Sequence, residues 1–204
     1  MIAILGYGLG NIKAFGNIYR ELNIPFVVAE DRATLASADR IILPGVGSFD
    51  HAMQRLRASG LYETLTEAVI EKGKPVLGVC VGMQMLAKSS EEGDEPGLAW
   101  IDGEVARIRF PDDAPRGLLP HMGWSTITAK ADEPLLDGLD DALGFYFLHS
   151  YRFVCSDPTD VIATADYATP FHCAVRRGNV YGVQFHPEKS HHNGIRLLKN
   201  FAES

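Results

Sequence analysis

A cysteine at the junction between an apolar run and a helical pattern is the residue of this chain best suited to nucleophilic chemistry. Cys80 lies in Gly-Val-Cys-Val-Gly at 78–82, directly after the apolar run 75–79. Small residues two positions to either side allow a sharp strand-to-helix turn, which exposes the central side chain. The N-terminus of the following helix carries partial positive charge, which favours the reactive thiolate. A buried core cysteine in an apolar strand would give the same local pattern.

A histidine and a glutamate near the C-terminus supply the other groups that a cysteine nucleophile needs. His186 and Glu188 lie two residues apart in Gly-Val-Gln-Phe-His-Pro-Glu at 182–188. In an extended segment such residues face the same side, so Glu188 could orient the imidazole while its other ring nitrogen faces the thiol. A histidine at a strand end is more often a plain rim residue. Its combination with the glutamate and the cysteine turn favours a Cys-His-Glu triad.

The elements that would position these residues alternate between strands and helices in the first half of the chain. Apolar runs predict strands, and apolar residues three and four positions apart predict helices. The predicted strands are 1–5, 25–29, 40–43 and 75–79, and the predicted helices are 12–22, 49–56, 61–70 and 81–87. This alternation indicates an α/β fold with a mostly parallel sheet flanked by helices.

The second half has short strand-like runs separated by turn signals, which predict antiparallel hairpins added to the parallel core. These runs are 105–108, 145–148, 152–155, 161–164, 173–176 and 180–185, followed by an amphipathic helix over 193–201. Neither a linker nor an internal repeat is evident. We therefore expect a single domain over residues 1–204.

Composition excludes several classes of function. The chain has 204 residues, 19 basic and 26 acidic, for a net charge of −7. Without a basic cluster, nucleic-acid binding is disfavoured. Apolar runs are too short for a membrane span, and the N-terminus resembles a first strand rather than a signal peptide. Three irregularly spaced cysteines predict reduced thiols and a cytoplasmic location, with no metal site.

A glycine cluster near the N-terminus invites comparison with dinucleotide-binding loops. Gly6-x-Gly8-x-Gly10 follows the first predicted strand, but the third glycine comes one residue too early for that fingerprint. A tight strand-to-helix turn, with Asn11 near the helix start, is the simpler interpretation. No cofactor is expected.

The motifs together resemble the class I (triad) glutamine amidotransferases, which have a flavodoxin-like fold. Beyond the two motifs above, three more make the resemblance more specific: Leu-Pro-Gly-Val-Gly at 43–47, Pro-His-Met-Gly-Trp at 120–124 and Tyr-Phe-Leu-His-Ser at 146–150. Within that family, the whole chain resembles the glutaminase subunits of imidazole glycerol phosphate synthase, from histidine biosynthesis. Two positions depart from the usual pattern: Gly6, where many members have aspartate, and Ser125, where asparagine is usual.

The resemblance implies a role for each matching residue. Cys80 would attack the carboxamide of L-glutamine to form a γ-glutamyl thioester, with His186 moving the proton and Glu188 holding His186. The remaining implied residues fall into two groups. The oxyanion and substrate would be bound by Val46, Gly47, Val81, Gln84, His149 and Ser150. The partner interface or ammonia exit would include Pro120, Trp124, Tyr146 and Lys189.

The resemblance also implies a partner, because a chain of this length has no room for a synthase domain. The partner would be a (β/α)₈-barrel cyclase subunit that forms a heterodimer and receives ammonia through a channel. The products would be imidazole glycerol phosphate and an aminoimidazole carboxamide ribotide. Two alternatives stay open: a paralogous glutaminase that supplies an amidotransferase of surface-polysaccharide synthesis, and a non-catalytic regulator with the same fold.

Overall fold

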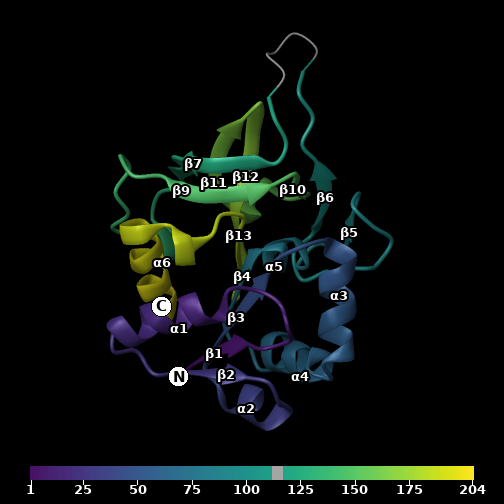
Figure 1. Ribbon diagram of the computed structural model, residues 1–204, viewed down its shortest axis with the longest axis vertical. Coiled ribbons are helices and arrows are strands. Elements are labelled where there is room, and N and C mark those ends of the chain that lie inside the picture. The colour runs from purple at the N-terminus through teal and green to yellow at the C-terminus, as the bar shows by residue number, and fades with distance from the viewer. Residues whose placement is uncertain (112–116) are drawn as a thin grey trace.

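The parallel half of the sheet forms the centre of the fold. The computed structural model describes residues 1–111 and 117–204 (Figure 1). The parallel strands lie in the spatial order β2 (Phe26–Ala29), β1 (Ile2–Leu5), β3 (Arg40–Gly45), β4 (Val76–Cys80) and β13 (Val180–Val183). Every residue of β1, β4 and β13 is buried, as expected for parallel strands covered on both faces. The predicted parallel sheet is confirmed.

Antiparallel strands extend the sheet beyond β13. These strands are β12 (Thr169–Arg177), β10 (Tyr151–Cys155), β6 (Gly103–Arg107), β11 (Val161–Tyr167) and β8 (Thr128–Ala129). A short strand, β5 (Ser89–Ser90), pairs in parallel with β6 at the edge. The hairpin of β11 and β12 confirms the expected antiparallel addition.

Helices cover the parallel strands from two sides. Figure 1 shows α1 (Ile12–Glu21) and α6 (His191–Glu203) together on one side, and α3 (Phe49–Ala58), α4 (Tyr62–Thr66) and α5 (Val81–Gln84) on the other. A further short helix, α2 (Arg32–Ser37), is capped at its N-terminus by Asp31, whose side chain accepts a hydrogen bond from the Thr34 N–H. The sequence patterns did not predict α2. Within the described residues, no helix has the length and apolar character needed to cross a membrane.

Two predicted helices differ from the prediction in the structure. The helix predicted over 81–87 ends at Gln84, because the carbonyls of Met85, Leu86 and Ala87 accept hydrogen bonds from residues 98–101 instead of from the next helical turn. The helix predicted over 61–70 ends as an α-helix at Thr66 and continues as a π-helical turn over Glu67–Glu71. The first of these deviations depends on tertiary contacts, which periodicity does not report.

Strand boundaries also shift at the sheet's carboxyl edge. The strand predicted to end at Leu43 continues through Pro44 to Gly45, which pairs with Cys80. Proline is tolerated there because β1 no longer pairs with β3 at this position, so no ladder hydrogen bond is lost on that side. The strand predicted over 180–185 ends at Val183, and α6 starts two residues earlier than expected.

The glycine cluster forms the predicted turn between β1 and α1. Gly8 and Gly10 both have φ of +91°, a conformation that glycine adopts without strain. A Cβ on Gly10 would lie 2.5 Å from the Cβ of Pro44, so the loop packs directly on the end of β3. The glycines therefore allow the chain to make a tight turn that packs against the edge of the sheet.

A second, two-stranded sheet lies beside the carboxyl ends of the parallel strands. It pairs β7 (His121–Ser125) with β9 (Phe145–His149), antiparallel, and His121 lies opposite His149 (Figure 1). Alternation gives it two faces: the inner face carries the two buried histidines, and the outer face carries Met122 and Trp124, which are 63% and 52% exposed. This small sheet brings the Pro-His-Met-Gly-Trp and Tyr-Phe-Leu-His-Ser segments together.

Candidate active site

The cysteine turn forms as the sequence predicts. Cys80 ends β4 with φ 56° and ψ −113°, and α5 begins at the next residue. A non-glycine residue at positive φ is strained and is held only where surrounding structure dictates it. Here the surroundings are tight: a Cβ on Gly82 would lie 2.0 Å from the carbonyl oxygen of Leu43, and one on Gly78 would lie 2.5 Å from that of Gly82. Only glycine permits β3, β4 and α5 to pass this closely.

His186 and Glu188 form a buried pair. Their side chains are 4% and 2% exposed, and Nδ1 of His186 lies 3.0 Å from Oε1 of Glu188. The geometry differs from the extended segment that we predicted, because Glu188 lies in a 3₁₀ turn, Pro187–Lys189, directly after His186. The turn still directs both side chains toward each other.

The electrostatics of the pair favour a protonated imidazole. Burial by itself lowers the pKa of His186, but hydrogen bonds to Cys80 and Glu188, together with their charges, outweigh burial and raise it to about 10. A protonated His186 beside Cys80 is placed to act as a general acid for a reaction at that residue. The arrangement is that of a nucleophile with a general acid–base partner and an orienting carboxylate.

Ser190 fixes the backbone that carries the histidine. Its hydroxyl donates to the carbonyl oxygen of His186 at 2.6 Å and accepts from the Tyr146 N–H at 2.9 Å. The His186 N–H in turn donates to the Tyr146 carbonyl oxygen at 2.9 Å. These bonds attach the backbone of His186 to β9 of the small sheet.

Two glutamines connect the thiol to the interior. Gln184 is fully buried and its Nε2 donates to Sγ of Cys80 at 3.8 Å, while its Oε1 accepts from Nε2 of Gln84 at 3.0 Å. Sγ of Cys80 also lies 3.9 Å from the carbonyl oxygen of Leu148. Sequence reasoning did not assign a role to Gln184 or Leu148, although both lie inside the motifs that it identified.

A cavity of about 330 Å³ opens at the thiol. Cys80 and His186 line it, with most of the other predicted site residues. Those others are Val46, Gly47, Val81, Gln84, Pro120, His149, Ser150 and Lys189. Three predicted residues lie outside the cavity wall: Glu188 behind His186, and Trp124 and Tyr146 on the small sheet.

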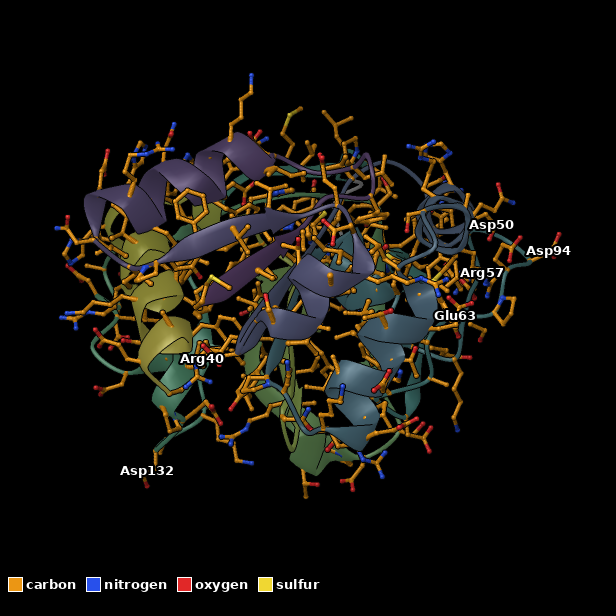
Figure 2. All side chains as sticks on the ribbon, turned by 90° about the horizontal axis from the view of Figure 1, so that it is seen from below. Arg40, Asp50, Arg57, Glu63, Asp94 and Asp132 are labelled. Atoms are coloured by element: carbon orange, nitrogen blue, oxygen red, sulfur yellow. The ribbon has the colours of Figure 1, made fainter. Side chains whose placement is uncertain are left out.

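Glu92 is a cavity-lining carboxylate that the sequence motifs did not predict. It lines the cavity, and its Oε2 accepts from the Phe49 N–H at the start of α3 at 2.8 Å. Asp50 holds the same loop by accepting from the Asp94 N–H at 3.0 Å (Figure 2). Gly93 lies between them, and a Cβ there would lie 2.1 Å from Oδ1 of Asp50, so a larger residue would displace that carboxylate. A lone glutamate in a loop carries no motif, so only tertiary contacts disclose its position.

The outer face of the small sheet borders the cavity. Trp124 lies opposite Tyr146 in the pairing, and their rings meet edge to face at 6.2 Å. Lys189 Nζ lies 5.5 Å from the centre of the Tyr146 ring, and His191 stacks on Trp124 at 5.3 Å. Met122 pairs with Leu148 on the same face. The structure thus gathers an exposed aromatic and apolar surface beside the cavity mouth.

The other two cysteines differ from Cys80 in environment. Cys155 and Cys173 are both buried and free. Burial raises the pKa of the Cys155 thiol to about 12 and also raises that of Cys173. Both thiols therefore stay protonated and unreactive at neutral pH.

Comparison with known proteins identifies a family that has this fold and this arrangement of cysteine, histidine and glutamate. Residues 15–204 match the family model described as glutamine amidotransferase class-I. The chain belongs to this family of enzymes.

Within this family, the chain is most informatively compared with individual relatives of known name. The chain is 54% identical over 204 residues, covering 100% of both chains, to "Imidazole glycerol phosphate synthase subunit HisH" of Bdellovibrio bacteriovorus. It is 50% identical over 202 residues, covering 99% of both chains, to the protein of the same name from Leptospira interrogans. A solved glutamine amidotransferase structure superposes with a TM-score of 0.76 at 21% identity, covering 99% of this chain and 97% of that one, which shows the shared fold. Similarity thus runs over the whole chain to HisH subunits.

Proposed function

We propose that the chain is the glutaminase subunit of imidazole glycerol phosphate synthase and supplies ammonia for a step of histidine biosynthesis. The observation that carries the proposal is the buried pair of His186 and Glu188 beside Cys80, at the mouth of a cavity large enough for an amino acid. The full-length similarity to HisH subunits supports the pathway.

The reaction uses the triad twice. The Cys80 thiolate attacks the side-chain carboxamide carbon of glutamine, and His186 donates its proton to the leaving nitrogen as the C–N bond breaks. Ammonia leaves and a γ-glutamyl thioester remains on Cys80. His186 then takes a proton from water, which attacks the thioester and releases glutamate. Glu188 keeps the imidazole oriented and stabilises its charge throughout.

The oxyanion of each tetrahedral intermediate forms beside two backbone segments. The Val81 N–H lies at the start of α5, where backbone N–H groups have no helical acceptor. On the other side lie Val46 and Gly47, which follow β3, whose last residue pairs with Cys80. Gly47 has φ of +87°, and no atom of the described residues lies within 4 Å of the place a Cβ would occupy, so this peptide can change orientation at low cost. A partner would switch the glutaminase activity on by turning the backbone N–H at Gly47 toward the oxyanion.

The cavity lining suits the ends of a glutamine molecule. The Glu92 carboxylate matches the α-ammonium group, since charge-assisted hydrogen bonds are the strong ones. Gln84, His149 and Ser150 supply uncharged polar groups at the cavity wall. These residues are proposed to bind substrate, and neither a metal nor an organic cofactor enters the mechanism.

The partner is proposed to be a (β/α)₈-barrel cyclase that docks over the outer face of the small sheet as a heterodimer. Trp124 and Met122 give that face exposed aromatic and apolar surface, which is typical of an interface core. Pro120 and Lys189 line the cavity beside it, so ammonia released at Cys80 would leave toward this side. Residues 1–204 act as one amidotransferase domain, and the unpaired thiols suit a cytoplasmic location.

Complementation tests the pathway. The gene should restore growth of a histidine auxotroph that lacks its own glutaminase subunit, whereas Cys80→Ala should not, because ammonia is no longer made from glutamine. A high concentration of ammonium should rescue the Cys80→Ala strain, since the cyclase accepts free ammonia. Failure of the well-expressed wild type would contradict the histidine-pathway assignment and favour the polysaccharide branch.

A further inference from the structure

A line of hydrogen bonds runs through the inner face of the small sheet to the cavity wall. Oγ of Ser125 lies 3.0 Å from Nε2 of His121, and Nδ1 of His121 lies 3.0 Å from Nε2 of His149. Nδ1 of His149 lies 2.8 Å from the carbonyl oxygen of Tyr151. Three side chains from two strands are thus joined in series.

The protons of this line have one consistent arrangement. A carbonyl oxygen only accepts, so Nδ1 of His149 carries the hydrogen and, in the neutral ring, Nε2 accepts. Nδ1 of His121 therefore donates, and its Nε2 accepts from the Ser125 hydroxyl. Burial lowers the pKa of His149 to about 3 and that of His121 to about 4, so both rings are neutral at physiological pH. Every polar atom of the two rings is then satisfied.

Aromatic packing keeps the central ring from turning. His121 stacks on Tyr167 with ring centres 4.0 Å apart, and on Phe147 at 4.8 Å. The contacts leave His121 with its donor directed at His149. His121 is thus held by stacking as well as by hydrogen bonds, and its hydrogen bond to His149 helps to hold that ring in place.

The far end of the line reaches the thiol. The Tyr151 carbonyl oxygen also accepts from Nε2 of Gln84 at 3.1 Å, and Gln84 is bonded through Gln184 to Cys80. His149 and its neighbours in 148–151 line the cavity. A shift of His149 would therefore change both the cavity wall and the glutamines beside the nucleophile.

We propose that Ser125 and His121 are positioning residues for the glutaminase reaction, which hold His149 and with it the cavity-lining segment 148–151. The proposal rests on the proposed glutaminase function. It assigns a role to Ser125, the residue that departs from the usual asparagine. Since Met122 and Trp124 occupy the opposite face of the same strand, any displacement of β7 also reaches His149 through this line.

Two substitutions at His121 separate positioning from packing. His121→Phe keeps an aromatic ring in the stack but leaves Nε2 of His149 without a donor, and an unpaired buried acceptor costs enough to lower kcat/KM by roughly tenfold or more. His121→Asn places an amide donor near the position of Nδ1 but loses the stack. We expect His121→Asn to be the less stable variant in urea and the more active one, within about threefold of wild type. Activity that follows stability, with the Phe variant the more active, would overturn the proposal.

Ser125 gives a second test on a partly exposed residue. Ser125→Ala should lower kcat/KM for glutamine roughly 2- to 10-fold, the effect of one ordinary hydrogen bond, and Ser125→Thr should restore it. Ser156→Ala, which removes a hydroxyl bonded to Asp102 away from the cavity, should leave the kinetics unchanged. Equal activity in the Ala variant and wild type, or no recovery with Thr, would contradict a positioning role.

The glutaminase function is checked in the same assays. If Cys80→Ala still hydrolysed glutamine, the proposed function would fail whatever the His121 and Ser125 variants did. If Cys80→Ala is inactive and the His121 and Ser125 variants behave as wild type, the positioning proposal alone fails.

Discussion

His186 holds its proton because two neighbours outweigh its burial. Cys80 and Glu188 raise its pKa to about 10, so the imidazole stays charged through neutral pH even though almost none of its surface meets solvent. Of the two, Glu188 is the one that stays fixed during turnover, because Cys80 becomes acylated. The carboxylate is therefore the permanent source of the charge stabilisation.

Substitution of Glu188 tests this assignment. Glu188→Gln keeps the size of the side chain and removes its charge, so the pKa of His186 should fall and the glutaminase kcat should drop about 10²- to 10⁴-fold. Ammonia-dependent synthesis by the complex should be unaffected, which controls for folding and assembly. A kcat within threefold of wild type would show that Glu188 does not support His186.

Glu92 is tested by the balance between KM and kcat. If its carboxylate binds the α-ammonium group of glutamine, Glu92→Gln should raise KM about 10-fold or more while kcat changes little, because the contact is equally present in the ground and transition states. Glu104→Gln, an exposed carboxylate on β6, is the matched control and should leave KM unchanged. A fall in kcat alone would assign Glu92 to the chemistry instead.

At the scale of elements, the site depends on a crossing where β3, β4 and α5 pass closely. Gly45, Gly78 and Gly82 each face backbone atoms at distances that exclude a Cβ. The crossing places Cys80 at positive φ and brings the segment after β3 beside it. The nucleophile is thus presented by close backbone packing rather than by its own conformational preference.

Gly82→Ala tests how strictly the close packing of β3, β4 and α5 requires glycine at this position. Its Cβ would meet the Leu43 carbonyl oxygen, so the free energy of unfolding in urea should fall by about 3 kcal/mol. Gly73→Ala is the control, since its φ of +66° carries strain but nothing lies within 4 Å, and should cost about 1 kcal/mol. Equal losses at the two positions would show that the crossing can relax.

The elements that could be predicted from the sequence are those whose conformation depends on residues next to them in the chain. The turn at Cys80 follows from its flanking glycines, and the alternation of apolar runs predicted the parallel strands and the added hairpins. By contrast, the early end of α5 depends on residues 98–101 reaching the carbonyls that a helix would use. Glu92 depends in the same way on contacts with α3, and His121 and His149 meet only through strand pairing. Such contacts between distant segments leave no periodic signal, and the motifs that contain His121 and His149 do not show that the two residues meet.

At the scale of the molecule, the chemistry lies between the parallel core and the small sheet. The core supplies Cys80 and, after β13, His186; the small sheet supplies the cavity wall and an exposed outer face (Figure 1). Because two neutral histidines are buried behind that face, the free energy of unfolding should depend on pH.

Acid should destabilise the protein through His121 and His149. Their folded pKa values, about 4 and about 3, lie below the ordinary value of 6.5, so their contribution is complete above about pH 6.5 and is lost as the pH falls toward 4, when only the unfolded chain takes up protons. Each neutral histidine adds a slope of up to about 1.4 kcal/mol per pH unit. Urea unfolding between about pH 6.5 and 5 should show a shallower slope for His121→Phe than for wild type. Equal slopes would mean that His121 is protonated in the native state.

Cys80 is proposed to release ammonia from glutamine, and this ammonia is proposed to enter the product made by the partner subunit. The most direct measurement of this transfer supplies the assembled complex with glutamine labelled with ¹⁵N in the amide, together with unlabelled ammonium in solution, and follows the label in the product by mass spectrometry. With wild type, the product should carry the label despite the unlabelled ammonium, and with Cys80→Ala it should carry none. Labelled product from Cys80→Ala, or unlabelled product from wild type, would contradict the account.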